Sequence, residues 1–596
     1  MSGLVAVMSE DRGSPLPAGE LAGLVEAYVA LRGGAPAERP VTAGDWAAAA
    51  LVHPPGLADG GLRHAGSSWL MRVGDTHPSE GSVRPRLEEL DGQFALLAYD
   101  AERGKVTAAT DPFGMQPLYS AEGDGRTYLS TSALVLARFL GARPRRLGLL
   151  SFLRAGYHFG TLTNWEGIDR FDPGTALRFG PDGIERLTYF SPEVDETVER
   201  LSFDAVVAHC LEVAVETLRA RLPTEETTWA DLTGGFDSRL LGLLLREAGI
   251  PFAVDTRGPA DVENVRIARR VAETARWDWR RVGLPDDWHE RAPELVETAL
   301  AWGDANLDVL ELAWVLWAHR ELAEDHPSLL IAGGGEHLRG FAWRQEFLRA
   351  GRSTTVNFDS WLDMRLLHPL DVSLFAVDPT PEVRADLEAR MRARAALYAG
   401  EPNTRQLDVL YAYKMTGHFG AFRAADEAFL ASRLPFYFRP IFTAAFSTAS
   451  RHRDNHRLMR HLIERLDPQV AAIRTTAGGP AQRWRPTNLH RFAPYYLDLG
   501  RRAVRKLSER AGRQLLVPEP PYAFTFTAVR RAMLRQLAGP GPQLRHADLV
   551  SGALYDPQAL DAFFERANEA GFPETPLLGR ILTVELALRA AGARLV

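Results

Sequence analysis

The stretch TWADLTGGFDSRLLGLLL, residues 228–245, places two glycines, an acid and a hydroxyl between an apolar run and a leucine-rich run. TWADLT (228–233) predicts a short buried strand, and SRLLGLLLREAG (238–249) predicts a helix that ends at Gly249. A glycine-rich turn between a parallel strand and a helix presents free backbone N–H groups beside the positive end of the helix. This stretch is therefore a candidate phosphate site.

The side chains of this turn favour the same chemistry. Gly234 and Gly235 let the backbone approach a ligand closely, and Thr233 and Ser238 offer hydroxyls to phosphate oxygens. Asp237 lies beside the predicted phosphate, which makes chemical sense if Mg²⁺ lies between them, because Mg²⁺ is bound by one or two carboxylates plus phosphate oxygens. The turn lacks the Gly-Lys-Ser/Thr ending of a Walker A loop and is not a G-x-G-x-x-G. The plainer interpretation is a tight strand-to-helix connection with a serine N-cap.

Bulk composition limits the class of protein. The chain has 596 residues, too many for one hydrophobic core, and its net charge of −7 gives no sign of general nucleic-acid affinity. The single cysteine, Cys210, excludes an internal disulfide, argues against a cysteine-based zinc site and favours a reducing, cytoplasmic setting. We expect no secretory signal, because MSGLVAVMSEDRG (1–13) has no basic n-region and no long apolar h-region, and no membrane span, because no segment reaches about 18 apolar residues.

The texture of the sequence changes near residue 200. Before it, short strand-like runs alternate with turns, as in the hairpins predicted at 93–111 and 172–183. After it, the strands predicted at 228–233, 251–258 and 327–332 alternate with helices, which predicts a parallel α/β sheet. Beyond about residue 400 the chain reads as mostly helical. We therefore expect three parts: residues 1–195, residues 200–500, and a helical C-terminal extension, 500–596, packed on the second part.

Several motifs resemble those of one family. TGGFDSR resembles the Ser-Gly-Gly-x-Asp-Ser pyrophosphate loop of N-type ATP pyrophosphatases, which include the asparagine-synthetase group. IAGGGEHLRGF (331–341) resembles the Gly-x-Gly-x-Asp-Glu-x-x-x-Gly-Tyr segment of those synthetases, and SRLPFYFRPIF (432–442) resembles their Arg-x-Pro-Phe-Leu-Asp segment. LEELDGQFALLAYD (87–100), DPFGMQPLYS (111–120) and YLSTSALVLA (128–137) resemble stretches of their glutaminase-like N-terminal domain. The resemblance spans about residues 1–485.

The resemblance implies a fold and a reaction. The fold is an α+β glutaminase-like (Ntn-type) β-sandwich domain, followed by an α/β parallel-sheet PP-loop synthetase domain with a helical C-terminal region. The reaction splits ATP between the α and β phosphates and forms an acyl-adenylate. Amidotransferases of this class begin Met-Cys-Gly and use the cysteine as nucleophile, whereas this chain begins Met1-Ser2-Gly3. We therefore expect no glutaminase activity, and expect the first domain to be a structural relic or a substrate platform.

Without ammonia from glutamine, the attacking amine must come with the substrate. Two kinds of relative work this way, the β-lactam synthetases and the lasso peptide cyclases. The Gly-Gly-Glu-x-x-Arg-Gly form at 334–340 is similar to the cyclases. Gly333 stands where β-lactam synthetases have a tyrosine, and IRTTAGGP (473–480) lacks their lysine. The resemblance therefore implies a lasso peptide cyclase that joins an Asp or Glu side chain of a core peptide to the peptide's own α-amine, releasing AMP and PPi.

The implied partners are a precursor (core) peptide, a leader peptidase and a leader-recognition protein, and the implied cofactors are ATP and Mg²⁺. Three alternatives stay open: a small-molecule amide or β-lactam synthetase, asparagine synthesis from free ammonia, and an inactive peptide-binding scaffold.

The resemblance also assigns residues to the site. Asp237 and Glu336 are the predicted Mg²⁺ ligands, and Lys414 is predicted to stabilise the adenylate phosphate during acyl transfer. Arg433 matches the family's arginine, with a possible phosphate contact, and Arg239 is predicted to contact phosphate or to close the loop. Each of these residues also has an interpretation without a catalytic role: the two acids as surface acids, the lysine as a solvated helix residue, and the arginines as surface residues. The predicted nucleotide-binding residues are Asp231, Leu232, Thr233, Gly234, Gly235, Asp237, Ser238, Arg239, Asp255, Thr256, Gly333, Gly334 and Gly335.

The cluster RHRDNHR (451–457) is either a solvated helical face or a surface that steers an acidic peptide.

Overall fold

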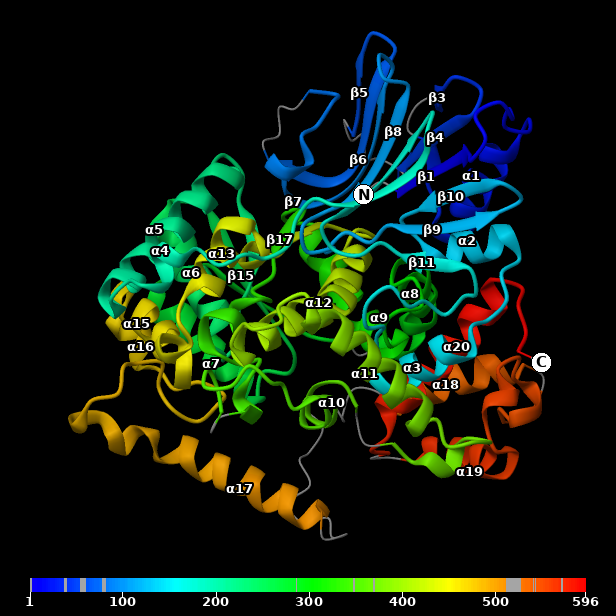
Figure 1. The fold of residues 1–596 in the computed structure, drawn as a ribbon. Coiled ribbons are helices and arrows are strands. Elements are labelled where there is room, and N and C mark those ends of the chain that lie inside the picture. Colours follow the sequence, from blue (N-terminus) through cyan, green and yellow to red (C-terminus); the bar gives the residue numbers. More distant parts are fainter. Residues whose placement is uncertain are drawn as a thin grey trace.

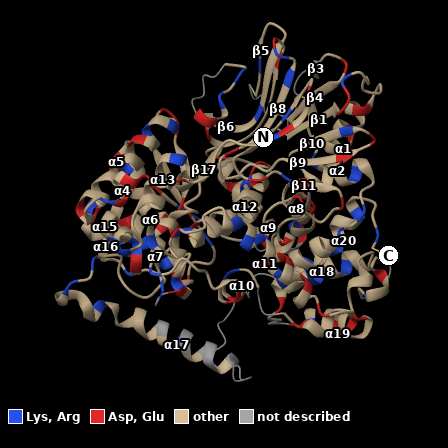
Figure 2. Cartoon of the chain, in the orientation of Figure 1, with Lys and Arg blue, Asp and Glu red and all other residues tan. Residues whose placement is uncertain are grey.

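A computed structural model gives the fold of most of the chain (Figure 1). It describes residues 3–36, 40–53, 61–77, 82–285, 287–346, 349–367, 370–510, 527–539, 541, 543–569 and 572–595. Within these ranges, no helix is long and apolar enough to cross a membrane. Basic and acidic residues are interspersed along most elements rather than separated by sign (Figure 2).

The first part of the chain forms two antiparallel sheets. Its strands are β1 (Gly3–Ser9), β2 (Ala35–Pro36), β3 (Val41–Ala43), β4 (Ala47–His53), β5 (Leu62–Ala65), β6 (Ser68–His77), β7 (Asp91–Asp100), β8 (Lys105–Thr110), β9 (Tyr119–Gly123), β10 (Arg126–Ser130), β11 (Ile168–Arg170), β12 (Thr175–Gly180) and β13 (Gly183–Thr188). One sheet runs β11-β9-β10-β1-β4-β2, with β3 beside β4, and the other runs β13-β12-β8-β7-β6-β5. Both predicted hairpins are present, as β7–β8 and β12–β13.

Alternation along β1 explains the layering. Leu4 and Met8 point into an apolar cluster that also contains Leu97 and Val106 of the other sheet. Val5 and Val7 point the opposite way, into a cluster shared with the helices α1 (Glu20–Arg32), α2 (Ala133–Leu140) and α3 (Arg146–Ala155). Because successive side chains of a strand point to opposite faces, β1 serves both the interior of the sandwich and its helical cover.

A parallel sheet forms the second part. Its strands are β14 (Thr228–Asp231), β15 (Phe252–Arg257), β16 (Trp279–Val282), β17 (Ser328–Leu330) and β18 (Ala431–Arg433), in the order β16-β15-β14-β17-β18. The chain moves outward from β14 to β16 and then returns to place β17 on the other side of β14. The strand order therefore reverses at β14, and ligands of open α/β sheets bind at the carboxyl end of such a switch point.

Helices cover both faces of this sheet. Ala230, Val254 and Leu330 face a cluster built with α5 (Phe203–Arg221), α6 (Asp237–Ala248) and α7 (Glu263–Ala275). Trp229 and Leu329 face the opposite cluster, which contains Leu322 of α9 (Val309–Ala323). As predicted, α6 ends at Gly249, whose φ of 71° gives the left-handed conformation typical of a helix C-cap.

Two strands of this sheet, β16 and β18, were not predicted. β16 reads WRRV, with two arginines that keep it at an edge, and β18 has only three residues. Neither has the apolar run by which buried strands are recognised from sequence. Their pairing is set instead by backbone hydrogen bonding to β15 and β17.

The C-terminal helices pack against both earlier parts. They are α17 (Ala493–Arg510), α18 (Thr527–Ala538), α19 (Pro557–Ala567) and α20 (Thr575–Ala590). α18 contacts α8 (Trp288–Trp302), and α20 contacts both α9 and α3. α17 instead extends away from the body of the protein in Figure 1. The extension thus reaches the N-terminal part as well as the part with the parallel sheet.

A buried polar cluster joins the part with the antiparallel sheets to the part with the parallel sheet. Arg423, on α12 (Asn403–Asp426), is 1% exposed and pairs with Glu427 at 3.1 Å. Its guanidinium also donates to the side-chain oxygen and the carbonyl of Gln93, both at 3.2 Å, and to the side chain of Gln116. Gln93 and Gln116 belong to the part with the antiparallel sheets. One buried arginine therefore links this part to the part with the parallel sheet through side chains that are shielded from water.

Arg423→Met should lower the free energy of unfolding by about 3–5 kcal/mol, because removing one partner of a buried pair leaves the other charge uncompensated. Chemical denaturation measures this. The matched control is Arg178→Met, whose pair with Glu185 is exposed and worth at most about 1 kcal/mol. A loss below about 1 kcal/mol for Arg423→Met would show that the cluster does not hold the parts together.

Candidate functional site

The turn after β14 holds its own donors in place. Ser238 Oγ accepts the Thr233 N–H at 2.9 Å, and the Thr233 and Ser238 hydroxyl oxygens lie 2.9 Å apart. The Gly235 N–H points to Thr233 Oγ1 at 3.2 Å, and the Gly234 N–H donates to Asn264 Oδ1 at 2.7 Å. The turn therefore gathers three backbone donors and two hydroxyls at the end of β14, the groups that an anion at a helix N-terminus uses.

The two predicted metal ligands lie together, with an arginine between them. Arg339 Nε and Nη2 donate to the two oxygens of Asp237 at 2.9 and 2.6 Å, and Arg339 Nη2 lies 3.6 Å from Glu336 Oε1. Glu336 also accepts the Gly334 N–H at 2.9 Å. Burial raises the pKa of Asp237 to about 6, with Arg339 opposing and Glu336 adding to the rise. Two acids in a desolvated place thus rely on a cation.

The glycines after β17 make this approach possible. Gly334 has a φ of 101°, where an L side chain is strained. A Cβ on Gly335 would lie 2.7 Å from Asp237, and one on Gly333 would lie 2.6 Å from Phe419. The turn after β17 therefore packs directly against the start of α6 at Gly335, where any Cβ would meet Asp237.

Gly335→Ala should lower the free energy of unfolding by about 1–3 kcal/mol, the usual cost of adding a group to a filled space. Thermal unfolding of the purified variant measures this. Gly123→Ala is the matched control, because a Cβ there meets no atom within 4 Å. Equal stability of the two variants would mean that the turns do not meet as closely as this.

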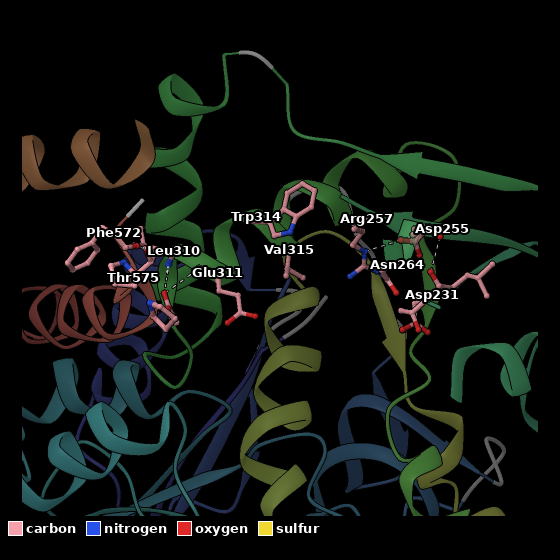
Figure 3. A pocket seen from close by; sticks show the side chains of 16 residues that line it. Asp231, Asp255, Arg257, Asn264, Leu310, Glu311, Trp314, Val315, Phe572 and Thr575 are labelled. Atoms are coloured by element: carbon pink, nitrogen blue, oxygen red, sulfur yellow. Dashed lines mark hydrogen bonds and ion pairs between the residues drawn. The ribbon is translucent and has the colours of Figure 1, made fainter. Parts of the chain in front are cut away.

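A cavity of about 390 Å³ opens beside the carboxyl ends of β14 and β15. At one end Figure 3 shows Asp231, Asp255, Arg257 and Asn264; toward the other it shows Leu310, Glu311, Phe572 and Thr575, with Trp314 and Val315 between. Asp255 pairs with Arg257 at 2.9 Å, while its buried Oδ1 has no hydrogen-bond partner among the described residues. The cavity thus combines polar groups at both ends with apolar side chains such as Trp314 and Phe572, a combination typical of a small-molecule site.

The nearby predicted residues have structural partners as well. Burial raises the pKa of Asp231 to about 7, and this carboxylate accepts the Ala332 N–H at 2.8 Å, which links β14 to the segment after β17. Thr256 donates to the Leu232 carbonyl at 2.8 Å. These two bonds hold the ends of three neighbouring strands in register at the mouth of the cavity.

Lys414 approaches the acids from α12. Its Nζ lies 5.4 Å from the ring centre of Tyr157 and 5.6 Å from that of Tyr411. Its pKa is lowered to about 8, mainly by burial and also by Arg365, with Glu336 acting in the opposite direction. The ammonium is therefore within the electrostatic reach of Glu336 and is not a solvated helix lysine.

The two predicted arginines lie elsewhere. Arg239 is fully buried and donates to the carbonyls of Val470, Ile473 and Arg474 at 2.8–3.1 Å. This matches closing of the loop rather than a phosphate contact, because the guanidinium is already committed to backbone. Arg433 Nε lies 3.4 Å from Asp75 of the antiparallel part, so it contacts the domain boundary instead of the carboxylate pair.

The cluster at 451–457 is not a uniformly solvated face. Arg453 is buried and pairs with Asp408 at 2.7 Å, and His456 stacks on Phe236 of the turn after β14 with ring centres 4.9 Å apart. Arg451 and Arg457 line a separate hollow of about 320 Å³ together with Trp484. One side of the cluster therefore supports the turn, and the other presents cations.

Sequence reasoning missed three contributors. Arg339 lies three residues after Glu336 on the 3₁₀ turn Gly335–Arg339, a spacing that signals a side-chain pair. Asn264 lies 30 residues beyond the turn whose N–H it binds. Phe572 comes from the C-terminal extension and lines the cavity. For Asn264 and Phe572 the sequence contains no local signal, since only tertiary packing brings them here.

Comparison with known proteins finds partial similarities to a glutamine amidotransferase domain and to asparagine synthetases. Residues 80–190 match the family model of the glutamine amidotransferase domain. Asparagine synthetase [glutamine-hydrolyzing] 3 of Bacillus subtilis (strain 168) is 29% identical over 155 residues, which are 26% of this chain and 25% of that protein. The asparagine synthetase [glutamine-hydrolyzing] of Rattus norvegicus is 25% identical over 215 residues, 32% of this chain and 35% of that protein. Parts of the chain are thus similar to asparagine synthetases, and residues 80–190 are similar to the glutamine amidotransferase domain.

These similarities are partial. The chain spans between a quarter and about a third of the length of these two curated relatives. One similar solved structure is glutamine phosphoribosylpyrophosphate (PRPP) amidotransferase from B. subtilis, complexed with ADP and GMP. The alignment covers 47% of this chain and 65% of that chain, at 12% sequence identity and a TM-score of 0.21. A TM-score of 0.21 is too low to show a shared overall fold. Met1 and Ser2, where the amidotransferase nucleophile would stand, lie outside the described residues.

Proposed function

We propose that the chain is an ATP-dependent, AMP-forming amide ligase. The observation that carries this is the pair of glycine turns at the switch point of the parallel sheet, which brings Asp237 and Glu336 together beside the donors of the turn after β14 and a cavity of about 390 Å³. The similarity to glutamine-hydrolyzing asparagine synthetases supports an amide-forming reaction. The cavity would receive the nucleoside, and the turn would receive its phosphates.

The residues present fit a magnesium ion. Asp237 and Glu336 lie together at the two turns, each within reach of Arg339, and within the described ranges no group of three or more His, Cys, Asp or Glu side chains could hold a metal ion. A pair of carboxylates that leaves further positions to phosphate oxygens is the donor set that Mg²⁺ prefers. When bound, the metal would neutralise charge on the departing pyrophosphate.

The reaction then has two steps. A substrate carboxylate oxygen attacks the α-phosphorus, the bond to the β-phosphate oxygen breaks, and pyrophosphate leaves. The Gly234 and Gly235 N–H groups and the Ser238 hydroxyl would hold the pyrophosphate, which requires Asn264 to release its hydrogen bond. A neutral amine next attacks the acyl carbon, loses a proton, and expels AMP, whose developing charge Lys414 would stabilise. Positioning and charge neutralisation account for most of the catalysis.

As to the substrate, we infer a lasso peptide cyclase, which closes a macrolactam between an Asp or Glu side chain and the peptide's own α-amine. Three sequence features support this: serine in place of the amidotransferase cysteine at position 2, the Gly-Gly-Glu-x-x-Arg-Gly form at 334–340, and the absence of lysine from 473–480. A precursor peptide, a leader peptidase and a leader-recognition protein would be its partners. The cationic hollow beside Arg451 and Arg457 would favour an acidic peptide segment.

The similarity to asparagine synthetases favours a second candidate, a ligase for a free amino acid and ammonia. ATP–pyrophosphate exchange separates the candidates. Exchange that requires a peptide supports the cyclase, exchange with free aspartate and none with peptide supports the second candidate, and no exchange with either would leave a peptide-binding scaffold.

Asp237→Asn should reduce ATP–pyrophosphate exchange by at least about 10³-fold, because it removes a metal ligand from the step that breaks the phosphoanhydride bond. Asp467→Asn is the control, since its carboxylate pairs with Arg246 at the far end of α6. Exchange within about threefold of the wild type in Asp237→Asn would remove this residue from the site.

The rate should also fall at alkaline pH. The pKa of Lys414 is lowered to about 8, so the ammonium loses its proton as pH rises through that value. Because kcat/KM follows the ionisation of the free enzyme, its alkaline limb should have a midpoint near 8. Lys414→Arg, which stays charged, should move that limb upward by at least about one pH unit while lowering the plateau. A limb that stays near 8 in this variant would assign the titration to another group.

A further inference from the structure

Arg339 occupies the position that a divalent cation would take. It binds both oxygens of Asp237 and approaches Glu336, and the three side chains are 14–17% exposed. Two carboxylates this close repel each other unless a positive charge lies between them. A guanidinium and a metal ion cannot fill one position, so the contacts of Arg339 and those of a metal exclude each other.

The way Arg339 is held sets it apart from the buried arginines nearby. Arg239 donates to three backbone carbonyls, and Arg453 donates to the carbonyl of His337. The hydrogen bonds and ion pairs of Arg339 within the described residues go to carboxylates alone, and its guanidinium lies 4.9 Å from the ring centre of Phe341. Carboxylates are partners that a divalent cation can take over, whereas a backbone carbonyl in a fixed segment would anchor the side chain.

Two further cations interact with Glu336. Arg365 lies 4.0 Å from the centre of the same Phe341 ring, and both Arg365 and Lys414 interact electrostatically with Glu336. Three cations thus face two acids. A concentration of cations in a desolvated place is matched by an anion such as a polyphosphate.

The backbone beside Arg339 has glycines at both ends. The 3₁₀ turn Gly335–Arg339 lies between Gly334, with a φ of 101°, and Gly340, with a φ of 62°. Glycine tolerates large changes of backbone angle at low cost, so a short turn between two glycines can reorient the side chain that it carries.

We propose that Arg339 exchanges partners during the reaction. In the ligand-free enzyme it is the internal counter-ion of Asp237 and Glu336. On binding of the metal–nucleotide complex it yields these carboxylates to the divalent cation, and its guanidinium pairs with a phosphate oxygen. The second half of this exchange rests on the proposed function, whereas the first half concerns the metal site alone.

The exchange predicts opposite effects of one substitution. Arg339→Gln should strengthen binding of Mn²⁺ alone by about tenfold, because the competing charge is gone, a factor that corresponds to about 1.4 kcal/mol. The same variant should weaken binding of α,β-methylene-ATP in saturating Mg²⁺ by about tenfold or more, because a phosphate partner is lost. Electron paramagnetic resonance measures free Mn²⁺, and calorimetry measures the nucleotide analogue.

Two variants serve as controls. Arg246→Gln removes an arginine from the far end of α6, where it pairs with Asp467, and should change neither affinity. Asp237→Asn should lose Mn²⁺ binding, which assigns the measured ion to this site. If Arg339→Gln does not fold, Arg339→Lys decides the question, because a lysine keeps the charge without the bidentate geometry and should change both affinities in the same directions by a smaller factor.

Unchanged or weaker Mn²⁺ binding in the Arg339 variant would overturn the proposal, and so would unchanged binding of the nucleotide analogue. A purely structural arginine would weaken both ligands together. Failure of the proposed function looks different: the wild type would show no ATP–pyrophosphate exchange with any carboxylate substrate, while the Mn²⁺ measurement would still report on Arg339.

Discussion

The repulsion between Asp237 and Glu336 is the constraint on which the site depends. These acids meet because the turns after β14 and β17 contact each other at the point where the strand order reverses, and Gly335 lacks the side chain that would meet Asp237 there. Like charges that are shielded from water must be neutralised, and Arg339 contacts both of them. The fold thus brings together two carboxylates that need a cation beside them, and the chemistry of the site depends on which cation binds there.

The sequence predicted the parts of the site that lie within one strand-and-turn unit. The turn at 233–238 and the glycines at 333–335 could be recognised because their chemistry is local: a short apolar run, a break and a helix start. Arg239 shows the limit, since its sequence position left both a phosphate contact and closing of the loop open, and only packing turns it toward the carbonyls of 470–474. Which way a side chain at the start of a helix points is decided by neighbours that are remote in sequence.

The same limit explains the missed strands and the missed cavity wall. β18 has three residues, and its place in the sheet depends on β17, about a hundred residues earlier. Phe572 reaches the cavity because α20 packs on α9 and α3, a contact between three parts of the chain. Such features arise from the shape complementarity of assembled elements, which no window of sequence contains.

The N-terminal domain lacks the amidotransferase cysteine yet is built into the rest of the fold. Arg423 hydrogen bonds to Gln93 and Gln116, and Asp304 accepts the Ala133 and Leu134 N–H groups at the start of α2 at 2.9 and 3.0 Å. Removing the domain would break these hydrogen bonds and expose to water the apolar side chains that the two parts share in one cluster, at about 1.5–3 kcal/mol for each large side chain that becomes fully exposed. Net stability is only about 5–15 kcal/mol, so a few such losses would unfold the part that carries the site. The domain is thus required by the stability of its neighbour, whether or not it has chemistry of its own.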